Sequence, residues 1–411
     1  GKGVQMGSME KLMMMRDVTF ENVSEGINIK GGMEGVMVMG MGTGLEKTTM
    51  TVNGKDDGVV GIKVEDTEKI NATVMGLNIV GDRSGGKGVE FIGKGGKGTL
   101  MLNMVEISGF ATGVSASGKG MVNIMGESAI TFTSGTGLEV KDTANATMMG
   151  GTIKGTDGKG YGVKMMGEGT VKMSNVGISE VKMGVEVKSG QLEMNMVGIS
   201  NVEKGVSVSK GTVEMMGTTI MVKSGDSGNS GSGYGVGVGV SGNGTVKMMG
   251  TTIMVTSGGT GKGTGVYVGG GGKVEMTSVD VSGFEKGVSV GGGTVTMDKV
   301  GISGVKMGVE VKSGTVMMKG GWIKGMGTGY GVIMEGGTVT MMDKVWISQV
   351  EKGVYAKSGT LKMMGGSAIT FAGGTGSYGV KVGGTATAHL TDVKIRGRVD
   401  RGRGWLWGVG R

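Results

Sequence analysis

The sequence offers few side chains that could carry out chemistry. It has 411 residues, no Cys and a single His, His389. A nucleophilic triad would have to use His389, and disulfides and Cys-based zinc sites are excluded. His389 lies in the segment Thr-Ala-His-Leu-Thr-Asp, which is typical of an ordinary strand. We therefore expect His389 to be structural, and we expect no metal site and no cofactor.

Acidic residues are the remaining candidates for cation binding or acid–base catalysis. Asp56-Asp57 and residues 64–69 (Val-Glu-Asp-Thr-Glu-Lys) offer the oxygen ligands that calcium prefers. The Gly-rich calcium repeat of some solenoids is not present as a series, so solvated surface charge is the favoured interpretation. Elsewhere acidic residues alternate with Lys, as in Glu186-Val-Lys188, and we expect no column of paired carboxylates. The segment Gly40-Met-Gly-Thr-Gly44 lacks the Lys-Ser/Thr of a phosphate-binding loop. The residues therefore predict that the chain is not an enzyme.

The elements that would position a site come from a repeat. In this pattern, apolar residues stand at positions 1, 4, 8 and 10 and Gly stands at position 7. One copy consists of Ile178, Val181, Gly184, Val185 and Val187. Copies with the same spacing begin at Phe20, Ile107, Ile178, Ile199, Val281, Ile302 and Ile347. A second element, Thr-Val-x-Met or a close variant, precedes the copies and often recurs after about 22 residues. A fixed period of this length indicates a solenoid.

Each repeat holds three short extended segments. In the third segment, after the Gly, apolar residues alternate with Lys, Glu or Ser, which is the period of a half-buried strand. We expect the Gly itself to have a positive φ that turns the chain. Gly, at 95 residues, is too frequent for helices, and parallel crossovers are right-handed in nearly all cases. The sequence predicts an all-β fold, a single-stranded right-handed parallel β-helix (β-solenoid) of about sixteen coils with three short strands per coil.

The repeat also divides the chain. Residues 1–395 are predicted to form one β-helix domain, and residues 396–411 an atypical Arg/Trp-rich tail, disordered or foreign to the repeat. The net charge of +8 comes partly from this tail, and the body is nearly balanced, so we expect no nucleic-acid partner. There is no run of about 18 apolar residues, so we expect no membrane insertion of this chain.

Long connections between the second and third segments should protrude from one edge of the rod, where solenoids often bind partners. The alternative is a flexible, solvated Gly/Ser loop. The candidate binding residues on this edge are Asp226, Asn229, Tyr234, Lys262, Asp82 and Arg83.

Methionine is unusually frequent, with 40 residues, often in Met-Met pairs such as Met148-Met149 and Met215-Met216. On a strand, one member of each pair should face the core and the other the solvent. Met fills irregular core gaps, but this does not explain the solvent-facing member. Two explanations of the high Met content remain: a copper-handling role for clustered Met, or an altered amino-acid composition.

The motifs Gly-Thr-Val-x-Met, Val-Lys-Ser-Gly and Ser-Ala-Ile-Thr-Phe (128–132 and 367–371) resemble passenger domains of pertactin-like autotransporters. They look closest to Bartonella-type proangiogenic autotransporter passengers. The resemblance implies a secreted or cell-surface protein that is attached to the outer membrane before release. It also implies a monomer that binds a host cell-surface protein or receptor, as an adhesin or as a mitogen for endothelial cells through a growth-factor receptor. The alternatives are a carbohydrate-active β-helix enzyme and a structural surface array without a specific partner.

Overall fold

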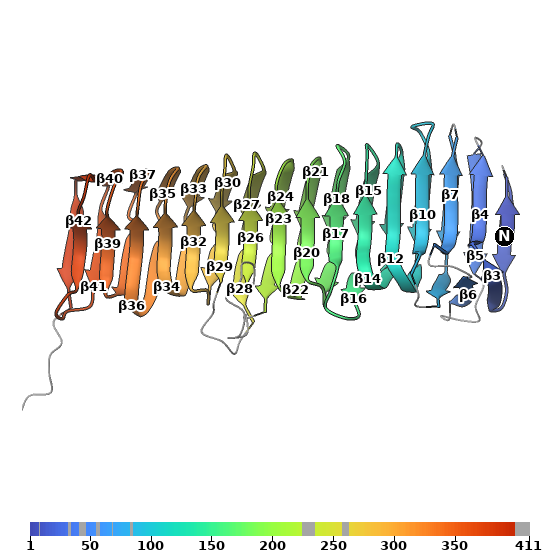
Figure 1. The fold of residues 1–411 in the computed structure, drawn as a ribbon, viewed down its shortest axis with the longest axis horizontal. Helices are drawn as coiled ribbons and strands as arrows, with labels where there is room; N and C mark the ends of the chain where they lie inside the picture. The colour runs from blue at the N-terminus through green and yellow to red at the C-terminus, as the bar shows by residue number, and fades with distance from the viewer. Residues whose placement is uncertain are drawn as a thin grey trace, which may run out of the picture.

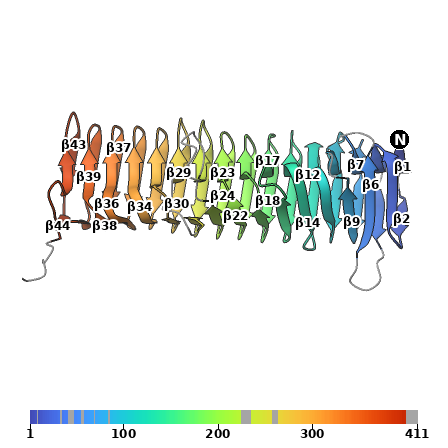
Figure 2. The same ribbon diagram turned by 60° about the horizontal axis from the view of Figure 1, so that its bottom comes forward.

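The chain folds as a straight rod of stacked strands (Figures 1 and 2). The computed structural model describes residues 1–7, 9–31, 34–40, 47–54, 58–67, 69–82, 85–223, 235–256 and 263–398. Within these ranges the regular elements are all strands, and the strands pair in parallel with the coil before and the coil after. The same ranges contain no helix of the length and apolarity needed to cross a membrane. The predicted parallel β-helix is confirmed.

Each coil contributes one strand to each of three faces, which we call sheets 1, 2 and 3 in chain order. In one coil these are β18 (Thr170–Ser174), β19 (Gly177–Ser179) and β20 (Met183–Val187). They correspond to the Thr-Val-x-Met element, the segment that starts at Ile178, and the segment after Gly184. The predicted three strands per coil are therefore confirmed.

Sheet 1 is sixteen-stranded. Its strands are β2 (Lys11–Met14), β5 (Glu34–Gly40), β8 (Asn71–Met75), β11 (Thr99–Asn103), β13 (Met121–Met125), β15 (Asn145–Met149), β18, β21 (Gln191–Asn195), β24 (Thr212–Met216), β27 (Thr245–Met249), β30 (Lys273–Thr277), β33 (Thr294–Asp298), β35 (Thr315–Lys319), β37 (Thr338–Met342), β40 (Thr360–Met363) and β43 (Thr387–Leu390).

Sheets 2 and 3 are joined by four long strands that run through both, so that together they form one hydrogen-bonded set of 28 strands. The joining strands are β12 (Glu106–Gly118), β14 (Ala129–Val140), β34 (Gly301–Val311) and β36 (Trp322–Met334). The other strands of sheet 2 are β3 (Val18–Val23), β6 (Thr48–Gly54), β9 (Leu77–Gly81), β16 (Thr152–Gly155), β19, β22 (Gly198–Val202), β25 (Thr219–Val222), β28 (Thr252–Val255), β31 (Asp280–Ser282), β38 (Trp346–Val350), β41 (Ser367–Phe371) and β44 (Val393–Gly397). The other strands of sheet 3 are β1 (Lys2–Met6), β4 (Glu25–Gly31), β7 (Val60–Asp66), β10 (Lys87–Gly93), β17 (Tyr161–Met165), β20, β23 (Lys204–Val208), β26 (Val236–Val240), β29 (Thr264–Val268), β32 (Lys286–Val290), β39 (Lys352–Ala356) and β42 (Tyr378–Val382).

The core consists of columns of like side chains along the rod axis. In sheet 2 one column is nearly all Ile, for example Ile178 against Ile199 and Ile199 against Ile220, all fully buried. In sheet 1 an inward column is Met in every coil from Met148 to Met363. A shared register puts the same apolar side chain above itself from coil to coil, so each coil buries its neighbour's inward face. Much of the high Met content is therefore core.

The prediction that the repeat Gly has a positive φ is wrong. Gly184 is not among the residues with positive φ. A Cβ on Gly184 would lie 2.6 Å from the carbonyl oxygen of Gly205 and 2.6 Å from Cγ2 of Ile199. The position needs Gly because the backbone of the next coil and an Ile side chain approach it closely. The left-handed turn lies four residues earlier, at Glu180 (φ 57°) in this coil.

The connections that the sequence predicted to protrude leave the coil between a sheet 2 strand and a sheet 3 strand, as predicted. This holds for the connections from β6 to β7, β9 to β10, β25 to β26 and β28 to β29. The last described strand, β44, contains Arg396, whose partner in the preceding coil is Thr370.

Candidate functional site

Most of the loop residues predicted to bind a partner, namely Asp226, Asn229, Tyr234, Lys262 and Arg83, lie outside the described residues. Asp82 is described. Its Oδ2 accepts a hydrogen bond of 3.2 Å from the amide of Gly54, the last residue of β6 in the preceding coil. This contact ties neighbouring coils together at the sheet 2 edge, so it gives Asp82 a structural task.

The other chemical candidates also take structural positions. His389 is exposed in β43 and pairs with Lys362 of β40, as expected for an ordinary strand residue. Asp66 is fully buried, so the interpretation of residues 64–69 as solvated surface charge is wrong for this residue. Its Oδ1 accepts a 3.0 Å hydrogen bond from the amide of Ile70, which fixes the turn after β7. The described residues contain no group of three or more His, Cys, Asp or Glu side chains that could hold a metal ion. Asp56, Asp57 and residues 41–44 lie outside the described residues.

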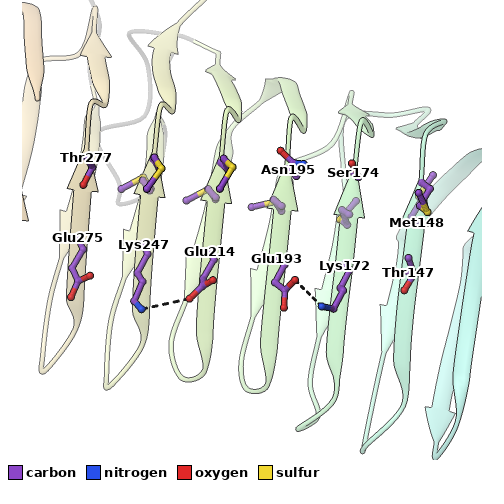
Figure 3. Close-up of a pocket in the computed structure, with 17 residues that line it drawn as sticks. Thr147, Met148, Lys172, Ser174, Glu193, Asn195, Glu214, Lys247, Glu275 and Thr277 are labelled. Carbon is purple, nitrogen blue, oxygen red and sulfur yellow. Dashed lines mark ion pairs between the residues drawn. The ribbon is translucent and has the colours of Figure 1, made fainter. Parts of the chain in front are cut away.

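A groove lies on the outer face of sheet 1. It has a volume of about 650 Å³ and crosses six successive strands from β15 to β30 (Figure 3). Strand alternation explains its shape. The inward residues of these strands are Val, Leu or Ala and Met, and the outward residues on either side of each inward Met form two parallel columns.

One outward column, the charged column, carries most of the groove's charge. It comprises Thr147, Lys172, Glu193, Glu214, Lys247 and Glu275 in register on successive strands. The Lys172 Nζ lies 2.9 Å from Glu193 Oε2, and the Lys247 Nζ lies 3.6 Å from Glu214 Oε1 (Figure 3). Glu275 has no ion pair within the described part of the chain. The column therefore has one carboxylate more than it has cations, at its β30 end.

The second outward column, the thioether column, supplies the apolar surface. It comprises Met149, Ser174, Asn195, Met216, Met249 and Thr277 in register. Met149, Met216 and Met249 are each more than half exposed, whereas the adjacent Met148, Met215 and Met248 are buried. The prediction that the two members of a Met-Met pair face opposite sides is confirmed for these pairs. Their solvent-facing members, which the sequence left unexplained, line the groove.

Glu193 and Glu214 are direct cross-strand partners. The neighbouring strands place Lys172 and Lys247 in the same column, so the two carboxylates form a single pair and not the column of paired carboxylates that the sequence argued against. The shared frame of Gln191-Leu-Glu-Met and Thr212-Val-Glu-Met could have revealed the pair. Most glycosidases use a pair of neighbouring carboxyl groups. A general acid, however, needs burial that favours its protonated form, and each of these carboxylates is half exposed and holds a Lys. This arrangement favours two groups that bind over a catalytic acid and base.

A second cluster lies on the outer face of sheet 3, near the end of the rod. Tyr330, Lys352 and Tyr378 are register partners on β36, β39 and β42, and Tyr355 pairs with Lys381 in the neighbouring column. The rings of Tyr355 and Tyr378 meet edge to face, with centroids 6.2 Å apart. Burial and the neighbouring Tyr330 raise the pKa of Tyr378 to about 12. This phenol therefore stays neutral at physiological pH and does not cancel the positive charge of the nearby Lys residues.

Comparison with known proteins adds no family to these observations. No protein-family model matches the chain, and no curated protein matches it.

Proposed function

We propose that the chain is an extracellular binding rod that engages a protein on the surface of a host cell through the groove on sheet 1, and that it acts without catalysis. The observation that carries the proposal is the row of exposed thioethers. Three apolar side chains are held in solvent along a surface that no other described segment covers. Flexible, polarisable Met is enriched in protein interfaces because it can adapt to the shape of its partner.

The occupant that best fits the groove is a protein segment with apolar side chains and one basic residue. Lys172 and Lys247 are already neutralised by Glu193 and Glu214, so the groove has little excess charge to attract a highly charged polymer. Among the carboxylates that line the groove, Glu275 alone lacks a counter-ion within the described residues, and a Lys or Arg of the partner would supply one. Apolar contacts with Met216 and Met249 would lie beside that pair.

The resemblance to autotransporter passengers supports the setting of this proposal. By that resemblance the rod is secreted or displayed at the bacterial surface, attached to the outer membrane before release, and acts as a monomer. The partner would then be a host receptor, and a growth-factor receptor on endothelial cells is the specific expectation. A structural array without a partner would have no use for an open, apolar groove.

A matched pair of variants tests the proposal. Met216 is 55% exposed in the groove, and Met13 is 52% exposed on the same sheet in β2, far outside it. Met216→Glu should weaken binding to endothelial cells at least about tenfold, because a charge would face the apolar part of the partner. Met13→Glu should leave binding unchanged, and Glu275→Lys should also weaken it. Equal binding by all of these variants would remove the groove from the function.

The paired carboxylates keep polysaccharide hydrolysis as a second candidate. Glu193→Gln and Glu214→Gln remove the acids and preserve the side-chain shape. Hydrolysis of any member of a polysaccharide panel by the natural chain, with loss of that activity in either variant, would establish an enzyme and overturn the proposed function.

A further inference from the structure

The coils at the end of the rod are strongly cationic. Residues 352–398 contain seven basic residues and one acidic residue, Asp392. By contrast, residues 145–277, which include the groove, contain twelve Lys and nine Asp or Glu. Five of the seven basic residues make no ion pair within the described part of the chain. These are Lys362, Lys381, Lys394, Arg396 and Arg398.

The unpaired cations surround the rod. Lys362 lies on β40 in sheet 1, Lys394 and Arg396 lie on β44 in sheet 2, and Lys381 lies on β42 in sheet 3. All four are exposed. Positive charge is thus presented on all three outer faces over the last two coils, and we call these residues together with Arg398 the collar.

The Tyr cluster holds part of this charge in place. The ammonium of Lys381 lies 5.1 Å from the ring centre of Tyr355 and 5.8 Å from that of Tyr378. The ammonium of Lys357 lies 5.6 Å from the ring centre of Tyr355. Cation–π contacts orient an ammonium group without neutralising it, unlike a carboxylate. Lys381 therefore presents a positioned positive charge.

These features select among polyanions. A flat anionic membrane would contact one side of the rod, whereas a flexible linear chain can follow a collar around three faces. Single-stranded nucleic acid binds largely by stacking bases on free aromatic faces. The face of Tyr355 already carries Lys ammonium groups, so the cluster offers charge rather than a stacking platform. A linear polysaccharide bearing sulfate groups needs only the charge and hydrogen-bond donors that the collar supplies.

We propose that the collar binds a sulfated linear polysaccharide, with Lys381 on the Tyr355–Tyr378 pair as its fixed anchor. The site is separate from the groove on sheet 1 and shares no residue with it. Glycan binding at the collar and protein binding in the groove can therefore fail independently.

Heparin, tested with the full chain, is the probe. The collar variant combines Lys362→Glu, Lys381→Glu and Lys394→Glu. The control variant combines Lys182→Glu, Lys188→Glu and Lys210→Glu. The three control residues are exposed Lys residues of the middle coils that also lack ion pairs within the described residues. Both variants change the net charge equally. The collar variant should bind heparin at least about tenfold more weakly at fixed salt, with a flatter dependence of affinity on salt, because fewer counter-ions are released. The control should change less than about twofold.

Three outcomes would overturn the proposal. An equal loss of heparin affinity in the two triple variants would mean that binding depends on net charge alone. Equal binding of desulfated heparin would remove the sulfate groups from recognition. Binding to vesicles of anionic lipid that depends on the collar, together with heparin binding that does not, would assign the collar to a membrane surface. Circular dichroism of each variant confirms that the strands remain, and the single variant Tyr355→Phe, which keeps the ring, should bind as the natural chain does.

Discussion

The coils from β15 to β30 and the coils from β39 to β44 share an interior and differ in their surfaces. Strands of both regions stack an aliphatic residue and Met inward in sheet 1, as Leu192 and Met194 do in β21 and Leu361 and Met363 in β40. Both regions also stack Ile in sheet 2 and mostly Val in sheet 3. The last strand of sheet 1, β43, departs from this pattern with Ala388 and Leu390. Outside, Lys and Glu side chains of neighbouring middle coils pair with each other, as Lys172 does with Glu193. The last coils carry cations with almost no carboxylates.

This difference separates what the fold requires from what it leaves free. Inward positions repeat because each coil must match the one below it. Outward positions face water, where a single ion pair contributes about 0–1 kcal/mol, so their charges can vary without loss of the fold. A surface that departs from the balanced pattern is therefore better explained by a ligand than by stability. The largest effects below test the common interior, and the smaller ones test the surfaces.

A charge placed in the Ile column should have the largest effect, and its position along the rod should decide the size. Ile178→Asp puts a carboxylate between Ile153 and Ile199, where burial is complete, and should cost at least about 4 kcal/mol. Ile395, in the last described coil, is 43% exposed, so Ile395→Asp should cost much less. Urea unfolding followed by circular dichroism measures both. If Ile178→Asp unfolds at the same urea concentration as the natural chain, the assignment of the columns is wrong.

Substituting the two members of a Met-Met pair should have very different effects on stability, because one member lies in the core and the other in the groove. Met215 is 2% exposed and its neighbour Met216 is 55% exposed. Met215→Ala opens a cavity in the inward column and should cost about 2–5 kcal/mol. Met216→Ala should change stability by less than about 0.5 kcal/mol, since it removes only surface contacts. Similar melting temperatures for the two variants would contradict the alternation of sheet 1 and the existence of the groove.

The repeat Gly residues should be intolerant of Ala for reasons of space. In Gly184→Ala, the new Cβ would crowd the Gly205 carbonyl and Ile199, at a cost of about 1–3 kcal/mol. Gly198 has no heavy atom within 4 Å of the same position and no positive φ, so Gly198→Ala should be neutral or should stabilise by up to about 1 kcal/mol. Thermal melts distinguish the two. Equal destabilisation would mean that conformation, and not close approach, sets the requirement for Gly.

The sequence predicted the strands of the coil well because every repeat carries the same pattern of inward and outward residues. Val185 and Val187 alternate with Glu186, and that alternation alone assigns their sides. The reason for Gly184 could not be read in the same way, because a positive φ and a close approach both select Gly. The groove and the collar were missed because they depend on which coils lie side by side. Met216 and Met249 are neighbours because β24 pairs with β27, and the sequence alone does not show that pairing.

The collar shows the same limit more strongly. Lys362, Lys381 and Lys394 lie far apart in the sequence and on three different faces. The excess positive charge is obvious in residues 396–411. However, five of the seven basic residues among residues 352–398 lie before residue 396. Charge that gathers around the last two coils is visible only after the register of the strands is known.

The smallest effect concerns Glu310, a carboxylate of the outer face that departs from the usual exposure. Its side chain is mostly buried, and it accepts hydrogen bonds of 2.8 and 2.9 Å from Lys286 and one of 2.8 Å from Ser289. Burial acts to raise the pKa of Glu310, but the bonds from Lys286 and Ser289 and the charge of Lys312 outweigh it, so the pKa lies below its ordinary value.

A carboxylate with a lowered pKa in the folded state stabilises the fold above its ordinary pKa, and this contribution is lost as the pH falls through the lowered value. At pH 7, Glu310→Gln should therefore cost about 1–2 kcal/mol, because Lys286 loses its charged partner. At an acidic pH below the ordinary pKa of a Glu carboxyl, the two proteins should differ less, since a growing share of the natural Glu310 is protonated as the pH falls. Urea midpoints at both pH values measure the difference, and Glu193→Gln, an exposed member of a groove ion pair, should show little effect at either pH. A gap between Glu310→Gln and the natural chain that widens as the pH falls would contradict the sign of the pKa shift. It would also mean that the ion pair between β32 and β34 does not stabilise the fold.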